Sequence, residues 1–359
     1  MNGKGQTKAF MNKTDDEKHR NRDLKKQKII ALLVGALVIL LSVFFYLLSL
    51  YIYAETPGSA LAEKKIFSIH TGQNINIIAE KLHHLKIIKN PSKFKMLSRI
   101  KALSHKLKTG EYELSPSMTP NEILDIIVSG KSMLYRITIP EGCNLTQVSL
   151  IIEKSELISC EKFYQVATDP AVTREMGISA DTFEGYLFPD TYLFPKKTTP
   201  KIIIGTMLNR FREIFTKEWK NQANRLGLSI HEVVILASMI EKETGSAFER
   251  PIISSVFHNR LQKGMRLESD PTVIYAIQDF DGNLTREHLQ TLTPYNTYKI
   301  TGLPLGPIAN PGKKSLEAAL YPADTDYLFF VSKRDATHQF SNNIDEHNRA
   351  VKIFQIQKR

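Results

Sequence analysis

Residues 29–54 read IIALLVGALVILLSVFFYLLSLYIYA, a run without a charged side chain. The run is longer than the ~20 apolar residues that a helix needs to cross a bilayer. It also exceeds the short apolar region of a signal peptide, and it ends in Tyr51, Ile52 and Tyr53 rather than in small residues before a cleavage site. We therefore predict an uncleaved transmembrane helix over residues 29–53.

The charges on the two sides of this run orient it. Residues 1–28 carry nine Lys or Arg and four Asp or Glu, whereas Glu55 and Glu63 follow the run. Basic flanks stay on the cytoplasmic side, so residues 1–28 are predicted to be a cytoplasmic tail with everything after the helix outside. The other residues hold 39 basic and 33 acidic side chains without a dense Lys/Arg stripe. This distribution argues against a nucleic-acid partner, whose phosphates require clustered cations.

The chain beyond the helix is long enough for more than one domain. With 359 residues, 42% hydrophobic and 24% charged, its composition is that of a folded protein. Residues 54–64 contain Pro57 and Gly58 and are predicted to be a linker. A small unit over 65–133 and a larger one over 134–359 both mix strand and helix patterns. The predicted fold class is α+β, anchored by a single N-terminal transmembrane helix.

The segment SIHEVVILASMIEKETG, residues 229–245, is the most informative helix pattern after the membrane run. Ser229 and Glu232 form an S-x-x-E capping box at its start, and Gly245 is a natural stop at its end. The residues between are almost wholly apolar, so we expect this helix to be buried.

Glu241 is the exception on that helix. It shares a helical stripe with Val234, Ala237 and Ser238, so it projects from a face that is otherwise core or cleft wall. A carboxylate shielded from water suits a general acid working near neutral pH. The alternative is that Glu241 is the first solvated residue of the polar end Glu-Lys-Glu.

Two further helices follow. Ser246 and Glu249 form a second capping-box pattern before a helix that runs to Gly264. Ser269 or Asp270 is then placed to cap a third helix. Asp270 is therefore either a cap or a residue of the functional site.

Six segments give the most specific information. They are EGYLFPDTY (184–192), LASMIEKETG (236–245), SDPTVIYA (269–276), PYNTYKITGLPLGPIANPG (294–312), SLEAAL (315–320) and EHNRAV (346–351). In this order they resemble the signature blocks of the MltG (YceG-like) family of endolytic murein transglycosylases. The resemblance implies that Glu241, which follows Leu-Ala-Ser and two apolar residues, is catalytic. One departure is Asn343, where the family tends to have Thr; Asn343 can still cap the last helix, with Glu346 as its partner.

The resemblance also has implications for the small unit and the cellular setting. The strand, helix, helix, strand order over 65–133 resembles the LysM-like subdomain of this family, which implies a grip on glycan; a structural spacer is the alternative. The implied location is the bacterial inner membrane with the catalytic domain, 134–359, in the periplasm. The implied partners are peptidoglycan glycan strands and peptidoglycan synthases, and no cofactor is expected.

The implied reaction needs one carboxylate. Glu241 protonates the oxygen leaving C1 of MurNAc and then accepts the proton of the C6 hydroxyl, which attacks C1 and leaves a 1,6-anhydro end. Such a cut within a strand would terminate the elongation of nascent strands. The candidate substrate-binding residues are Glu184, Tyr186, Asp190, Ser238, Asp270, Tyr295, Asn296 and Tyr298. The loop to Gly312 that carries the last three is predicted to contact glycan, with a purely structural scaffold as the alternative.

Two other classes of protein stay open. One is a membrane-anchored peptidoglycan-binding protein without catalysis. The other is a glycoside hydrolase, which would pair Glu241 with a second carboxylate; the candidates are Glu184, Asp190, Glu243 and Asp270. Cys143 and Cys160 could form a disulfide or remain free thiols. No cluster with the spacing of metal ligands occurs, so no metal is expected.

Overall fold

The computed structural model describes the backbone of residues 5–356 and the side chains of residues 25–356. Residues 1–4 and most side chains of the predicted cytoplasmic tail therefore lie outside the described part. The chain forms two compact units, a small unit over 1–133 and a large unit over 134–359, and each is described by itself.

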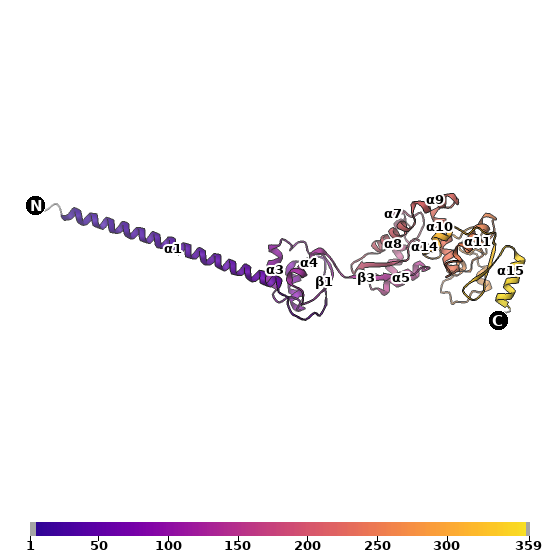
Figure 1. Cartoon of the computed structure of the whole chain (residues 1–359), viewed down its shortest axis with the longest axis horizontal. Coiled ribbons are helices and arrows are strands. Elements are labelled where there is room, and N and C mark those ends of the chain that lie inside the picture. The colour runs from indigo at the N-terminus through magenta and orange to yellow at the C-terminus, as the bar shows by residue number, and fades with distance from the viewer. Residues whose placement is uncertain (1–4, 357–359) are drawn as a thin grey trace. The chain divides into compact units, whose positions relative to one another are not determined.

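The small unit contains one long helix, four short elements around a core, and a capped final helix (Figure 1). Its elements are α1 (Gly5–Glu55), β1 (Lys65–Ile69), α2 (Ile75–His84), α3 (Pro91–Ile100), β2 (Gly110–Leu114) and α4 (Pro120–Ser129). The strands β1 and β2 pair antiparallel, with Phe67 opposite Tyr112 in the core. Thr119 and Glu122 make a complete capping box on α4, and Gly130 ends that helix in the left-handed conformation.

Within the described residues, one helix is by itself long and apolar enough to cross a membrane, the part of α1 from Lys25 to Glu55. The last two turns of α1 pack into the small unit. Leu50 and Ala54 are 4% and 3% exposed and belong to the core of the small unit, where α1 packs against α3 and α4. The helix α1 is therefore continuous with the fold of the small unit, because its C-terminal end supplies core side chains.

The large unit is a mixed α+β fold with two two-stranded antiparallel sheets, β3 with β4 and β5 with β6, in its described residues. The strands are β3 (Leu134–Thr138), β4 (Thr191–Pro195), β5 (Phe329–Ser332) and β6 (His338–Ser341). The helices are α5 (Leu145–Lys154), α6 (Cys160–Ala167), α7 (Pro170–Glu175), α8 (Pro200–Ile214), α9 (Lys217–Arg225), α10 (Ile230–Glu243), α11 (Arg250–Gln262), α12 (Asp270–Tyr275), α13 (Arg286–Gln290), α14 (Lys313–Leu320) and α15 (Ile344–Val351), followed by a π-helical turn (Lys352–Ile356).

The helix α10 is the centre of the large unit. Every residue from Val233 to Ile240 is buried, and α10 packs against α14, α11 and α12. Ser229 and Glu232 form the predicted capping box. A helix enclosed on all sides fixes any side chain at its last turn, since that turn cannot shift without moving the core.

Three helix-end predictions are wrong. Ser246 and Glu249 form no capping box, because the Glu249 carboxylate accepts from the backbone and the ring of His338 instead. Ser269 stands at the cap of α12 without a capping bond, and its hydroxyl donates to Glu243. Gly245 is not the stop of α10 either, since the helix ends at Glu243 and its C-cap residue, Thr244, is already extended. At Glu249 and Ser269 a contact distant in sequence replaced the local one.

Candidate active site

The buried helix α10 carries Glu241 to the edge of the core of the large unit. Val234, Ala237 and Ser238, the residues of its stripe, are all fully buried. The side chain of Glu241 itself retains 7% exposure. Its carboxylate is thus neither a solvated end residue nor fully enclosed.

Two donors hold the carboxylate of Glu241. Arg250 donates from Nη2 to Oε1 at 3.3 Å, and the backbone amide of Gly312 donates to Oε2 at 2.9 Å. Gly312 is the residue before the first turn of α14, so the positive end of that helix faces the carboxylate. The Arg250 side chain is 10% exposed, and its Nε has no hydrogen-bond partner in the described part of the chain. One donor of this site is therefore left free.

A second carboxylate, Glu141, lies beside the first. A side chain at Gly312 would collide with the Glu141 carboxyl group, so that group lies against the Gly312 backbone. Partial burial raises the pKa of Glu141, the charge of Glu241 adds to the rise, and Arg250 opposes it. Gly142 has φ +76°, and a Cβ there would lie 3.5 Å from Glu241 Cγ. The loop before α5 therefore approaches Glu241 closely.

Asn310 joins that loop to the one before α14. Its backbone amide and its Nδ2 both donate to the Cys143 carbonyl, at 2.8 and 2.9 Å. Its carbonyl accepts from the amide of Gly142 at 3.0 Å, and its Oδ1 accepts from the amide of Leu187 at 2.9 Å. Asn310 is fully buried. This one side chain fixes the positions of both loops that meet at Glu241.

Glu184 contacts the side chain of Asn310. Its Oε2 accepts from the Leu145 amide and the Tyr275 hydroxyl, both at 3.0 Å, and its Oε1 accepts from Asn310 Nδ2 at 3.3 Å. It is 3% exposed, and desolvation raises its pKa from 4.5 to about 7. All three donors belong to the protein, so Glu184 ties Leu145, Tyr275 and Asn310 together.

Three more of the predicted binding residues are internal. Ser238 accepts from the Ile308 amide at 3.0 Å, which ties the loop before α14 to α10. The Tyr186 hydroxyl bonds to His231 Nδ1 at 2.8 Å. Asn296, 1% exposed, donates to backbone carbonyls of its own loop. Their positions favour a structural role over contact with a substrate.

The remaining four lie nearer the surface but not in one group. The Tyr298 hydroxyl donates to Asp270 at 2.7 Å, and both line a 510 Å³ cavity together with Glu243. Asp190 pairs with Arg210 at 2.9 Å. The rings of Tyr295 and Tyr275 pack with centroids 5.0 Å apart.

Cys143 and Cys160 are both free thiols.

The sequence analysis missed Glu141, Arg250, Asn310 and Gly312. Asn310 and Gly312 stood inside a quoted segment, and Glu141 directly precedes the Gly142 that turns the chain. Their punctuated Pro, Gly and Asn context was a usable signal for a tight loop. No sequence pattern indicated Arg250, because it begins α11 and its partner, Glu241, lies on the preceding helix α10.

The sequence profile of one protein family matches residues 67–353, and it is that of the YceG-like family. The chain belongs to this family. The endolytic murein transglycosylase of Bacillus subtilis (strain 168) is 33% identical over 299 residues, which cover 79% of this chain and 82% of that protein. The endolytic murein transglycosylase of Streptococcus pneumoniae serotype 2 is 27% identical over 330 residues, 82% of this chain and 59% of that one. A yceG-like protein of Listeria monocytogenes, solved by crystallography, matches with a TM-score of 0.56 and 34% identity over 80% of this chain and 98% of that one.

Proposed function

We propose that this protein is an endolytic murein transglycosylase that cuts between MurNAc and GlcNAc within peptidoglycan strands and leaves a 1,6-anhydroMurNAc end. The observation that carries the proposal is the Glu241 carboxylate, held by Arg250 and the Gly312 amide at the edge of a buried helix. The shared family with two endolytic murein transglycosylases supports it.

Glu241 performs both proton transfers in this mechanism. In its acid form it gives a proton to the glycosidic oxygen, and the C1–O bond of MurNAc breaks. The resulting carboxylate takes the proton of the C6 hydroxyl as that oxygen bonds to C1. The nucleophile belongs to the same sugar, so no water has to be positioned. Arg250 and Gly312 keep the carboxylate in one orientation through both steps.

The neighbouring charges serve the transition state. The glycosidic carbon becomes positively charged as the bond breaks. The Glu141 carboxyl group lies against the Gly312 backbone, whose amide donates to Glu241, so its negative charge is close enough to the reacting sugar to stabilise such a cation. We assign Glu141 this electrostatic role.

Four of the predicted residues act through others. Glu184 holds Asn310, and Ser238 holds Ile308, so both fix the loops at Glu241. Tyr186 and Asn296 stabilise the surrounding fold. Asp270 and Tyr298 in the 510 Å³ cavity, with Asp190 and Tyr295, stay as proposed contacts to the glycan.

The cellular setting follows from α1. We propose that residues 29–53 span the bacterial inner membrane, that the N-terminus is cytoplasmic, and that both units lie outside. The small unit over 65–133 would hold the glycan in the manner of a LysM-like domain, and the unit over 134–359 would cut it. Cutting next to the membrane would end the elongation of nascent strands beside peptidoglycan synthases.

Incubation of the full chain in detergent with purified glycan strands tests the proposal, with mass spectrometry of the products. We expect internal cuts with 1,6-anhydroMurNAc ends. Intact strands that co-purify with the protein would instead identify a binding protein without catalysis. Reducing MurNAc ends would identify a glycoside hydrolase that uses Glu141 or another second carboxylate.

A further inference from the structure

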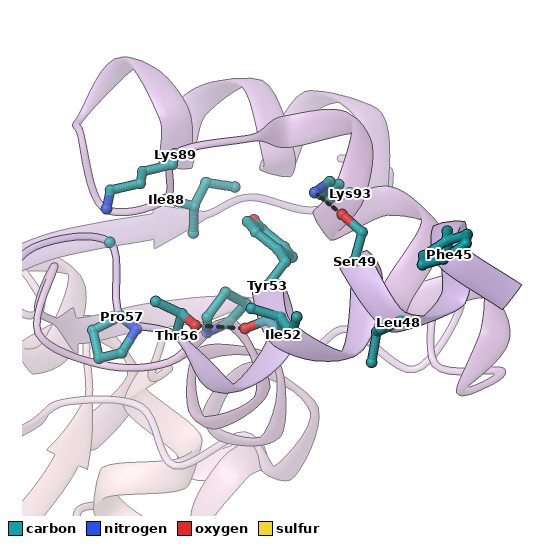
Figure 2. A pocket seen from close by; sticks show the side chains of 12 residues that line it. Phe45, Leu48, Ser49, Ile52, Tyr53, Thr56, Pro57, Ile88, Lys89 and Lys93 are labelled. Carbon is teal, nitrogen blue, oxygen red and sulfur yellow. Dashed lines mark hydrogen bonds between the residues drawn. The ribbon is translucent and has the colours of Figure 1, made fainter. Parts of the chain in front are cut away.

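A cavity of 440 Å³ lies in the small unit where the outer end of α1 meets α3 and α4. Figure 2 shows Leu48 and Ile52 of α1 on one side of it, Lys93 beside Ser49 toward the Phe45 end, and Lys89 toward the Pro57 end. Its volume falls within the range of small-molecule sites. One side of the cavity is apolar and the other is cationic.

The depth of this cavity follows from the length of α1. An upright helix rises about 1.5 Å per residue, so the ~30 Å hydrocarbon core takes about 20 residues. Counted from Ile29, directly after the charged Lys28, the outer boundary of the hydrocarbon falls near Leu48 and Ser49. Phe45 is then at acyl-chain level, while Lys93 is level with the outer headgroups because its Nζ donates to Ser49 Oγ at 2.6 Å.

The cationic side has no acidic partner among the described residues. Neither Lys89 nor Lys93 forms a salt bridge there, and the first turn of α3, which begins between them, carries no acid. Lys93 uses one of its three ammonium donors on Ser49 and lies 5.9 Å from the Tyr53 ring centroid. The positive end of α3 adds to the same field. A phosphate is the group this surface fits.

We propose that the cavity binds one anionic phospholipid of the outer leaflet, with its phosphate at Lys93 and one acyl chain along Phe45 and Leu48. The positive charge of the lysines favours an anionic headgroup. The apolar side chains of α1 favour a lipid over a free phosphate ion. The bound lipid fixes the depth at which the small unit meets the membrane. This site is independent of the catalytic assignment.

Native mass spectrometry of the full chain, with phosphatidylglycerol or phosphatidylcholine added to the detergent, tests the proposal. We expect one retained phosphatidylglycerol and no comparable retention of phosphatidylcholine. Each interfacial lysine contributes about 1 kcal/mol to attraction by anionic lipid, so Lys93→Gln should weaken retention roughly fivefold, while Lys89→Gln, farther from the phosphate, should weaken it less.

Two controls separate lipid binding from other effects. Lys95→Gln removes the same charge from the same helix, but Lys95 pairs with Glu80 and does not line the cavity, so retention should equal that of the unmodified chain. Ser49→Ala breaks the bond to Lys93 and keeps its charge, so retention should persist. Equal retention of the two lipids, an equal loss in Lys95→Gln, or retention of a polyprenyl diphosphate but not of phosphatidylglycerol would overturn the proposal.

Discussion

Glu184 and Glu241 are both carboxylates at the core of the large unit, yet their surroundings differ. The oxygens of Glu184 accept from three donors of the protein, and the side chain is enclosed. Glu241 has two donors, 7% exposure, and beside it an arginine whose Nε is unpartnered in the described part of the chain. Burial alone therefore does not identify a catalytic carboxylate. Glu241, the proposed catalytic residue, differs from Glu184 in having an unpartnered donor, Arg250 Nε, beside it.

The largest expected effect separates the two carboxylates by chemistry. Glu241→Gln keeps size and shape but removes the exchangeable proton, so turnover on glycan strands should fall on the order of 10²- to 10⁴-fold. Folding should be unchanged, as measured by the fluorescence of Trp219, the single tryptophan, which lies in the large unit. Near-normal turnover of this variant would remove Glu241 from the mechanism.

The next effect tests the second carboxylate. A methyl group at Gly312 would displace the flexible Glu141 side chain, and φ −76° at Gly312 accommodates alanine. Gly312→Ala and Glu141→Gln should each lower turnover on the order of 10²-fold, and the double variant should lose little more, because both remove one interaction. Gly205→Ala, inside α8 with open space around its Cβ, is the matched control and should keep full turnover. Additive losses would mean that Glu141 and Gly312 act separately.

The third effect concerns stability. Glu184→Gln replaces one carboxylate oxygen by an NH₂ group, which must then face a protein group that also donates. This mismatch should lower the free energy of unfolding by about 1–3 kcal/mol. The Trp219 unfolding transition should therefore move to lower urea. Glu243→Gln is the matched control: Glu243 also has its pKa raised to about 7, but its partner is the Ser269 hydroxyl, which can rotate to accept. An equal loss of stability in both variants would contradict the special bracing role of Glu184.

These same residues show which parts of the fold and of the candidate site could be predicted from the sequence. The buried stripe that carries Glu241 and the capping box of α10 were predictable because they depend on residues three to seven positions apart along one helix, whereas the proposed catalytic role of Glu241 came from the resemblance to the family. The α+β class and the membrane helix were predictable from hydrophobic runs. Arg250, Glu141 and Asn310 were not, since each contacts a residue that belongs to a different element. The mistaken cap at Glu249 has the same cause: His338 is its partner, 89 positions away.

A smaller effect depends on pH. The folded-state pKa of Glu184 is about 7 against 4.5 for the ordinary group, so the folded chain holds a proton that the unfolded chain releases. The free energy of unfolding should fall as pH rises from about 4.5 to 7 and then level off. Glu184→Gln and Glu243→Gln should each flatten that slope in urea titrations. An unchanged slope in both would show that neither group titrates in this window.

The smallest effect is expected at the cysteines. Cys143 serves the site through its backbone carbonyl, which accepts from Asn310, and both thiols are free. Cys143→Ser with Cys160→Ser should therefore leave turnover within about twofold, within the small range of substitutions that break no named interaction. A large loss without unfolding would reveal a thiol function.

In the proposed mechanism Glu241 alone transfers both protons, while the C6 hydroxyl of MurNAc attacks C1 of the same sugar. Digestion of glycan strands by the full chain in ¹⁸O-labelled water, followed by mass spectrometry of the new ends, tests it most directly. We expect 1,6-anhydroMurNAc ends without ¹⁸O, because no water oxygen enters the product. Reducing MurNAc ends that carry ¹⁸O would contradict it and identify a hydrolase.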